Sequence, residues 1–153
     1  MRTFWRISNY PDLSGEGSKR ASARWNSKGR LIVYLAESPA GAMLERLVHL
    51  LDTEGQLPRT YDLLRIDASE ELTSKDLLPL ADVDWRNRVD VTQHIGEAWL
   101  ASRETPLARV PSAIMPHTWN VLLNPEHPDA KKLEVAEVIR ERFDARLFRS
   151  GPR

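Results

Sequence analysis

Apolar side chains in the first third of the chain follow two successive patterns. Residues 31–35 (Leu-Ile-Val-Tyr-Leu) form a continuous β-branched and aromatic run, which is typical of a buried strand. Ser38 and Pro39 then suit the N-cap and first position of a helix, and Gly55 and Pro58 follow its end. Apolar residues recur along this helix at steps of three and four, in one stripe: Ala40, Met43, Leu44, Leu47, Val48 and Leu51. The sequence therefore predicts a strand followed at once by an amphipathic helix.

Shorter patterned segments predict the remaining elements. Residues 91–102 predict a second helix with Ile95, Ala98 and Trp99 on one face, and residues 9–21 predict a loop. The tail at 131–143 matches neither the helical nor the strand period. Four further strands are predicted, at 3–8, 61–67, 107–110 and 119–123. Because strands outnumber helices and do not alternate with them, we expect a compact α+β domain rather than a doubly wound sheet.

The composition narrows the class of protein. A length of 153 residues predicts a single domain over residues 1–153. The chain carries 22 basic and 22 acidic residues, so binding to nucleic acid through an overall positive charge is not expected. It has no cysteine, which excludes disulfides, thiolate zinc sites and cysteine nucleophiles.

The sequence also predicts a location. Arg2 and Arg6 interrupt what would have to be the apolar core of a signal peptide. No apolar run approaches the ~18–20 residues that span a bilayer. We therefore expect a cytoplasmic protein that does not bind a membrane.

Few residues remain as candidates for chemistry. The four histidines lack the spacing of a metal site, and no phosphate-binding glycine loop or nucleophile elbow is present, so we expect no metal. A cluster remains in the first third of the chain: Arg24-Trp25-Asn26, Tyr34, Glu45 and His49. At ~100° per residue, Glu45 lies roughly 120–130° from the centre of the apolar stripe, and His49 lies one turn along the same flank.

Each candidate also has a purely structural explanation. A Glu/His pair on a helix flank is usually solvated, and a tyrosine in an apolar strand is usually a core aromatic with its hydroxyl at the edge. An arginine beside a tryptophan usually lies over a ring at the surface. Ser112, which follows Pro111, is typical of a turn. Only the combination of these residues favours a functional site.

In order along the chain, these residues and their neighbours resemble the RES-domain family, which is named for its arginine, glutamate and serine. The resemblance covers essentially the whole chain. It implies a single domain with a mixed, partly split β-sheet and flanking helices, similar to the ADP-ribosyltransferase toxin fold. The segments that carry it are Arg24-Trp-Asn with Lys28-Gly, Tyr34, residues 42–49 (Ala-Met-Leu-Glu-Arg-Leu-Val-His), Val110-Pro-Ser112, residues 123–128 (Leu-Asn-Pro-Glu-His-Pro) and residues 144–148 (Asp-Ala-Arg-Leu-Phe).

The resemblance also implies a function. Members of the family are toxins of type II toxin–antitoxin pairs that cleave NAD⁺ between nicotinamide and ribose, and pass the ADP-ribosyl group to water, phosphate or a protein. For this chain it implies NAD⁺ as the substrate and an Xre-type helix-turn-helix antitoxin that covers the active site. It also implies a homodimer within that complex, with DNA binding left to the antitoxin.

Carried over residue by residue, the resemblance assigns a role to each matching position. Glu45 supplies a negative charge near the oxocarbenium-like ribose and accepts a hydrogen bond from a ribose hydroxyl. Arg24 holds the pyrophosphate or the ribose, and Tyr34 offers a ring to stack on the nicotinamide. Ser112 orients the substrate through its hydroxyl, and His49 is a weaker match at the binding site.

Two features depart from the family pattern. Ser22 and Ala23 stand where small residues, often glycines, precede the Arg-Trp pair, which would matter if the backbone approached NAD⁺ closely there. Arg46, directly after Glu45, stands where an apolar residue is expected.

Three alternatives stay open on the sequence. A protein ADP-ribosyltransferase toxin would use the same residues. A module that binds or cleaves RNA is favoured by five tryptophans and by 17 arginines among the 22 basic residues, but disfavoured by the zero net charge. A catalytically inactive subunit that only binds the antitoxin is disfavoured because every matched site position holds the expected residue type.

Overall fold

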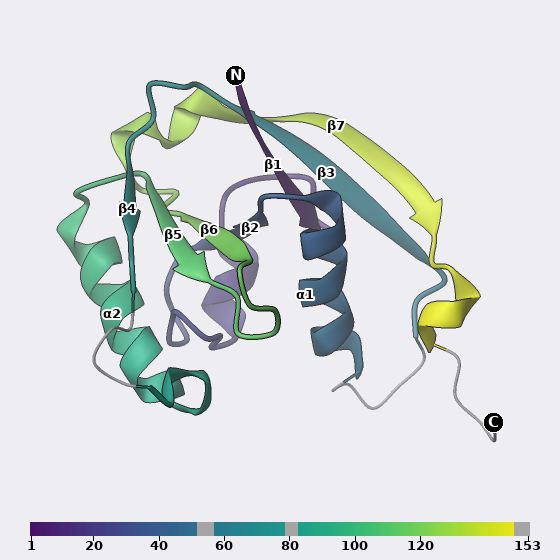
Figure 1. Cartoon of the computed structure of the whole chain (residues 1–153). Coiled ribbons are helices and arrows are strands. Elements are labelled where there is room, and N and C mark those ends of the chain that lie inside the picture. The colour runs from purple at the N-terminus through teal and green to yellow at the C-terminus, as the bar shows by residue number, and fades with distance from the viewer. Residues whose placement is uncertain (52–56, 79–82, 149–153) are drawn as a thin grey trace.

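Strands dominate the computed structural model of the chain, which describes residues 1–51, 57–78 and 83–148 (Figure 1). In this part of the chain seven strands form one sheet in the order β4-β5-β6-β2-β1-β3-β7. Only β4 and β5 pair in parallel, so the sheet is mixed, as predicted. The strands are β1 (Arg2–Ile7), β2 (Val33–Ala36), β3 (Thr60–Ala68), β4 (Ser74–Asp76), β5 (Leu107–Pro111), β6 (Trp119–Leu123) and β7 (Leu133–Arg142).

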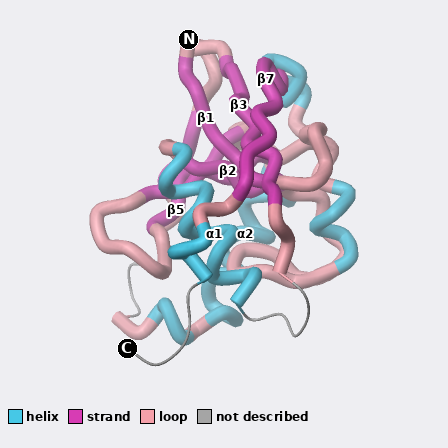
Figure 2. Tube along the Cα trace, turned by 90° about the vertical axis from the view of Figure 1, so that its right-hand side faces the viewer, coloured by secondary structure: helices cyan, strands magenta, loops and turns pink. Residues whose placement is uncertain are grey.

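The sheet is nearly divided between β1 and β2. β1 pairs with β3 along its whole length, but it meets β2 at one register position, where Trp5 lies opposite Ala36. On one side of this seam β1, β3 and β7 run side by side (Figure 2), and on the other side β2 continues into β6, β5 and β4. The partly split sheet that the sequence predicted is thus a continuous sheet with a weak join.

Two α-helices of the described residues flank the sheet, α1 (Pro39–Leu51) and α2 (Val89–Ser102). α1 begins as predicted, because the Ser38 hydroxyl accepts a hydrogen bond from the Gly41 N–H at 2.9 Å. Gly55, the expected stop signal, lies outside the described residues. α1 packs against both β1 and β2 and so lies over the seam (Figure 1). No helix in the described part of the chain is long and apolar enough to cross a membrane.

The buried faces of the helices differ from those expected. On α1, Ala40 and Val48 of the predicted stripe are exposed, whereas Ala42 and Leu50 are buried. On α2, Ala98 is exposed, and the buried residues are Thr92, Gly96, Trp99 and Leu100. Residues of each helix contribute instead to the wall of the cleft described below, among them Val48 of α1 and Gln93 of α2.

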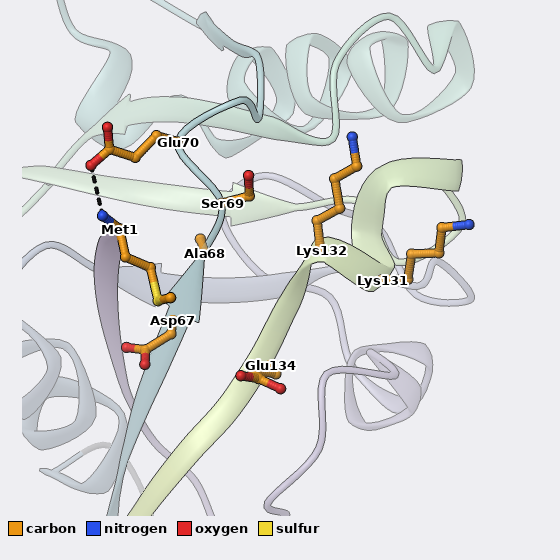
Figure 3. A pocket seen from close by; sticks show the side chains of 8 residues that line it. All are labelled: Met1, Asp67, Ala68, Ser69, Glu70, Lys131, Lys132 and Glu134. Atoms are coloured by element: carbon orange, nitrogen blue, oxygen red, sulfur yellow. Dashed lines mark hydrogen bonds and ion pairs between the residues drawn. The ribbon is translucent and has the colours of Figure 1, made fainter.

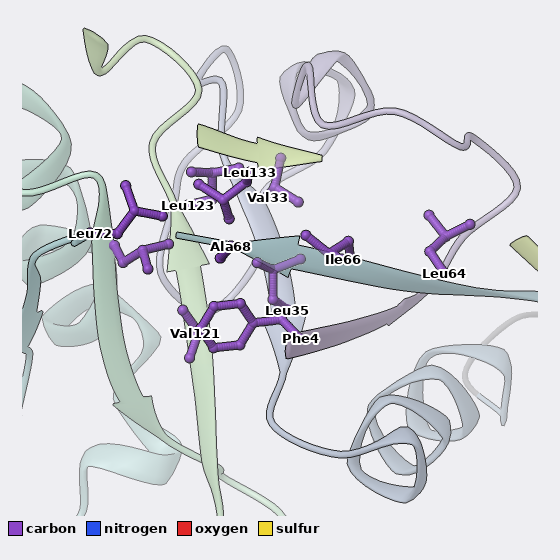
Figure 4. Close-up of a cluster of buried hydrophobic side chains, with 11 residues drawn as sticks. Phe4, Val33, Leu35, Leu64, Ile66, Ala68, Leu72, Val121, Leu123 and Leu133 are labelled. Carbon is purple, nitrogen blue, oxygen red and sulfur yellow. The ribbon is translucent and has the colours of Figure 1, made fainter. Parts of the chain in front are cut away.

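Two apolar clusters form the core. The first (Figure 4) takes side chains from both sides of the seam, among them Phe4 from β1 and Leu35 from β2, so packing joins what strand pairing barely connects. The second joins Trp25 to Trp99 of α2 and to Leu122 of β6. Each fully buried side chain of this size contributes about 1.5–3 kcal/mol.

The strands that the sequence did not predict carry little apolar patterning. All three residues of β4 are exposed, so β4 shows no apolar alternation. β7, within the unassigned tail, is an edge strand with mostly exposed residues, and the pairing register shifts between Arg65 and Ile66, which interrupts the two-residue period of the tail. The predicted loop at 9–21 contains a short 3₁₀ helix, Glu16–Arg20; the other 3₁₀ helices are Trp85–Asn87, Pro128–Lys132 and Ala145–Phe148.

Candidate active site

A cleft of about 520 Å³ opens beside the seam of the sheet. Its walls are the β1 and β2 residues at the seam, one face of α1, the loop of residues 22–25, the start of α2 and the segment that ends β5 and begins β6. The predicted residues Arg24, Tyr34, Glu45 and His49 all line it. The cleft is therefore where residues that are distant in the sequence come together.

Glu45 is the carboxylate in the wall of this cleft, and it is held at one oxygen. Oε1 accepts hydrogen bonds from the Asn120 side-chain amide at 2.8 Å and from the Ser112 hydroxyl at 3.1 Å. Among the described residues Oε2 has no hydrogen-bond partner. Glu45 is half-buried, so it is neither a solvated helix edge nor a core residue. The carboxylate is oriented by the protein with one oxygen left for a ligand.

Ser112 is a turn serine, as its sequence context predicted, but its hydroxyl contacts Glu45 and does not line the cleft as a residue that orients the substrate would. Its hydroxyl accepts from the backbone N–H groups of Ile114 and Met115 at 3.1 and 3.2 Å, as a turn serine does, while it donates to Glu45. Ser112 is buried and is not part of the cleft wall. It acts on the site through the orientation of Glu45.

Asn120 is the site residue that the sequence analysis missed. It lies on β6, opposite Ala36 of β2, and lines the cleft. Its Nδ2 donates to Glu45, and its Oδ1 is buried with no partner in the described part of the chain. The available signal was an amide side chain beside the apolar run of residues 121–123, a position that needs a polar partner when buried.

Tyr34 lines the cleft, and its hydroxyl forms hydrogen bonds with the loop that carries Arg24. The hydroxyl donates to Asn26 Oδ1 at 2.5 Å and accepts from the Trp25 N–H at 3.2 Å. Burial raises the pKa of this phenol well above its usual value, so the hydroxyl stays protonated. Tyr34 therefore positions the loop through its hydroxyl, independently of any contact that its ring makes.

Arg24 lies between the cleft and its rim. Its Nη1 donates to the Arg86 carbonyl at 2.9 Å, and its guanidinium stands 5.8 Å from the Trp85 ring centroid. Arg24 therefore lies over a tryptophan ring, as expected, but the ring is that of Trp85. Trp25, its neighbour in sequence, is buried in the core. Burial lowers the pKa of Arg24, and the negative charge of Glu45 opposes that shift. The arginine and the glutamate of the predicted set therefore act on each other.

The loop that carries Arg24 is fixed by α2 through its carbonyl groups. The Thr92 hydroxyl donates to the Arg24 carbonyl at 2.5 Å, and the Gln93 amide donates to the carbonyls of Ala23 and Asn26 at 2.9 and 3.1 Å. Gly96 packs on the Trp25 backbone so closely that a Cβ at this position would lie 2.0 Å from the Trp25 carbonyl oxygen.

The same loop carries Ser22 and Ala23, which stand where the family often has glycines. Ser22 is exposed and Ala23 is half-buried, and both line the cleft. The Trp25 backbone of this loop closely approaches α2 at Gly96.

The cleft concentrates positive charge in a chain of zero net charge. Arg6, Arg24 and Arg46 line it together with one carboxylate, Glu45, and the exposed His49 at its edge. Three arginines around one glutamate suit an anionic ligand with phosphate groups. Among the described residues no group of three His, Cys, Asp or Glu side chains is arranged to hold a metal ion.

A second hollow, of about 480 Å³, lies at the starts of β1 and β7 and the end of β3 (Figure 3). Some of its charged groups form ion pairs: the terminal amine of Met1 pairs with Glu70 at 2.7 Å, and Lys132 pairs with Asp129 outside the hollow at 3.1 Å. It contains none of the residues matched in the sequence analysis.

Known proteins resemble the chain along most of its length. Residues 3–146 match the family described as the RES domain. A protein named Toxin Res from Pseudomonas putida is 45% identical over 147 residues, 95% of this chain and 99% of the relative. The Prs ADP-ribosylating toxin of a Sphingobium species is 39% identical over 162 residues, 97% of this chain and 98% of the relative.

The fold also matches a chain of the crystal structure of the M. tuberculosis MbcT–MbcA toxin–antitoxin complex. The TM-score is 0.71 at 20% sequence identity, and the match covers 96% of this chain and 86% of that one. At this identity the likeness concerns the fold.

Proposed function

The chain belongs to the RES-domain family, and on that premise we propose that it is a toxin that cleaves the bond between nicotinamide and ribose in NAD⁺. The observation that carries the proposal is the Glu45 carboxylate, held at Oε1 by Asn120 and Ser112 and unbonded at Oε2 within the described chain. A fixed carboxylate in a cleft lined by arginines suits a substrate whose sugar becomes cationic while its phosphates stay anionic.

The chemistry needs only groups that the cleft contains. When the C1′–N bond breaks, its electron pair goes to the ring nitrogen and leaves neutral nicotinamide and an oxocarbenium-like ribose. Glu45 stabilises that positive charge, and its Oε2 is available to accept a hydrogen bond from a ribose hydroxyl. The acceptor, water or phosphate, then bonds to C1′, and a water molecule that attacks loses a proton to solvent.

The other residues position the substrate and Glu45. We assign Arg24 to the ribose or its neighbouring phosphate, because its charge acts on Glu45. The Tyr34 ring offers a face for the nicotinamide, and His49 lies at the edge of the same cleft. Ser112 and Asn120 hold Glu45 at Oε1.

A direct assay of nicotinamide release from NAD⁺ by the purified protein tests the proposal. Arg24→Ala is expected to lower kcat/KM by about 10- to 100-fold, because one charge-assisted contact is worth roughly 1.5–3 kcal/mol. Arg30→Ala is the matched control, since Arg30 is exposed and lies outside the cleft. If neither water, added phosphate nor cell extract supports release by the wild type, NAD⁺ cleavage is rejected.

Transfer of the ADP-ribosyl group to a protein is a second candidate function. It is favoured by the relative from Sphingobium, which is named an ADP-ribosylating toxin. The same glutamate would serve both reactions, because both pass through loss of nicotinamide. Incubation of labelled NAD⁺ with cell lysate separates them: a labelled protein band supports transfer, and free ADP-ribose or its phosphate ester supports degradation.

We further propose that the toxin is neutralised by a small Xre-type helix-turn-helix antitoxin and forms a homodimer within that complex. The likeness in fold to a chain of a toxin–antitoxin complex supports an antitoxin partner. Expression of this chain alone is expected to arrest growth, and co-expression of the protein encoded beside it is expected to restore growth. Growth that continues when the chain is expressed alone in soluble form would contradict the toxin assignment.

A further inference from the structure

Two arginines meet in the cleft on its β1 side. Arg6 projects from β1 and Arg46 from α1, and both line the cavity. Burial lowers the pKa of Arg6; the charge of Asp12 opposes this shift, and the positive charge of Arg46 adds to it. The two arginines thus bring two positive charges to the wall of one cavity. Arg46, unexpected in the sequence, faces a ligand cavity rather than bulk solvent.

Neither arginine forms an ion pair within the described residues. Arg6 Nη1 donates to the backbone carbonyl of Asp12 at 3.3 Å, while the Asp12 carboxylate accepts from the N–H and hydroxyl of Ser14 at 3.0 and 2.7 Å. Some other arginines of the described chain do form short ion pairs. Arg140 lies 2.8 Å from Asp62, and Arg146 lies 2.8 Å from Asp144.

Such an arrangement favours a ligand with two or more negative charges. Two cations on a half-buried surface repel each other, and a bound dianion turns that repulsion into attraction. The planar guanidinium fork matches phosphate oxygens in paired hydrogen bonds, which a lysine does not offer. Glu45, the one carboxylate in the cleft lining, is oriented by Asn120 and Ser112 and forms no ion pair with either arginine in the described residues.

We propose that Arg6 and Arg46 form a subsite for a phosphate-type anion, separate from Arg24. Because Glu45 and Arg46 of α1 both line the cleft, an anion held there lies in the same cavity as the carboxylate that acts on the ribose. This deepens the proposed function and rests on it only for the source of the anion. The anion is either the pyrophosphate of the dinucleotide or a free inorganic phosphate.

Binding of inorganic pyrophosphate to the purified protein tests the subsite without any turnover. Calorimetry at constant ionic strength is expected to show binding that Arg46→Gln and Arg6→Gln each weaken about tenfold or more. Arg20→Gln removes the same charge from an exposed position outside the cleft and should leave the affinity unchanged. Equal affinity in all four proteins, or no binding by the wild type, overturns the proposal.

Loss of folding cannot account for the expected result. Arg46→Gln removes a like charge and no hydrogen bond or ion pair of the described residues, so its ligand-free Tm should equal or exceed that of the wild type, whereas the rise in Tm on adding pyrophosphate should shrink. Arg6→Gln also removes the bond to the Asp12 carbonyl, so for this variant the test is the pyrophosphate-induced rise alone. A lower ligand-free Tm accompanied by an unchanged pyrophosphate-induced rise contradicts the subsite.

Kinetics then distinguish the two sources of the anion. If the subsite holds the dinucleotide, Arg46→Gln raises KM for NAD⁺ and does not change KM for nicotinamide riboside, which has no pyrophosphate. If it holds free phosphate, Arg46→Gln abolishes the stimulation of the wild type by phosphate and leaves KM for NAD⁺ unchanged. Pyrophosphate binding in a protein that releases no nicotinamide would support the subsite and reject the proposed reaction.

Discussion

Replacing Glu45 by glutamine is expected to lower kcat for nicotinamide release by about 10²- to 10³-fold, the size of effect seen when one fixed group that stabilises a transition-state charge is lost. The glutamine oxygen can still accept the hydrogen bonds that Asn120 and Ser112 donate to Oε1. The substitution therefore removes the negative charge and preserves the geometry. Because the ribose is cationic only near the transition state, KM should change much less than kcat.

Glu37→Gln provides the matched control for this prediction. Glu37 is exposed, precedes α1 and does not line the cleft, so the same chemical change there should leave kcat unaltered. Urea denaturation should show Glu45→Gln within about 1 kcal/mol of the wild type, because its hydrogen bonds have a replacement. A Glu45→Gln protein with full kcat would remove Glu45 from the chemistry.

Replacing Gly96 by alanine is expected to give the largest loss of stability. The added Cβ would lie 2.0 Å from the Trp25 carbonyl oxygen and 3.0 Å from the carbonyl carbon, so the backbone of α2 or of the Arg24 loop has to move. Overpacking costs about 1–3 kcal/mol, and a contact this short against main chain lies at the upper end. The gain of about 1 kcal/mol in helix propensity offsets only part of it.

Urea denaturation of Gly96→Ala against Gly17→Ala measures this effect. No atom lies within 4 Å of a Cβ built at Gly17, and its φ is not in the left-handed region, so alanine there should be close to neutral. In the folded fraction, Gly96→Ala should also lower kcat/KM, because the loop carrying Arg24 is displaced. Stability equal to that of the wild type would show that α2 does not press on this loop.

The sequence predicted the elements in which local pattern and tertiary packing agree. The run at 31–35 and the helix after Pro39 carry strong periods, and both form within two residues of their expected bounds. The weak periods mark the edges of the sheet: β4 is wholly exposed, and β7 contains a register shift. An edge strand that faces solvent needs no apolar alternation, so periodicity cannot find it.

The candidate site could be predicted only where a motif carried it. Arg24, Tyr34, Glu45 and Ser112 came from the RES resemblance, since each alone has an ordinary structural explanation. The groups that fix them come from far along the chain: Asn120 bonds to a residue 75 positions away, and Gln93 to one 70 positions away. Such partners are set by how β6 and α2 dock, which no local pattern records.

The contacts between α2 and the loop that carries Arg24 determine which positions of the sequence can be substituted while the loop keeps its place. The loop is fixed at carbonyl oxygens, which every amino acid supplies, and not at the side chains of Ser22 and Ala23. Neutral substitution at those two positions can proceed without loss of the loop. The selective constraint falls instead on a hydroxyl at Thr92, a carboxamide at Gln93 and a bare Cα at Gly96, on a helix that itself carries none of the motif residues.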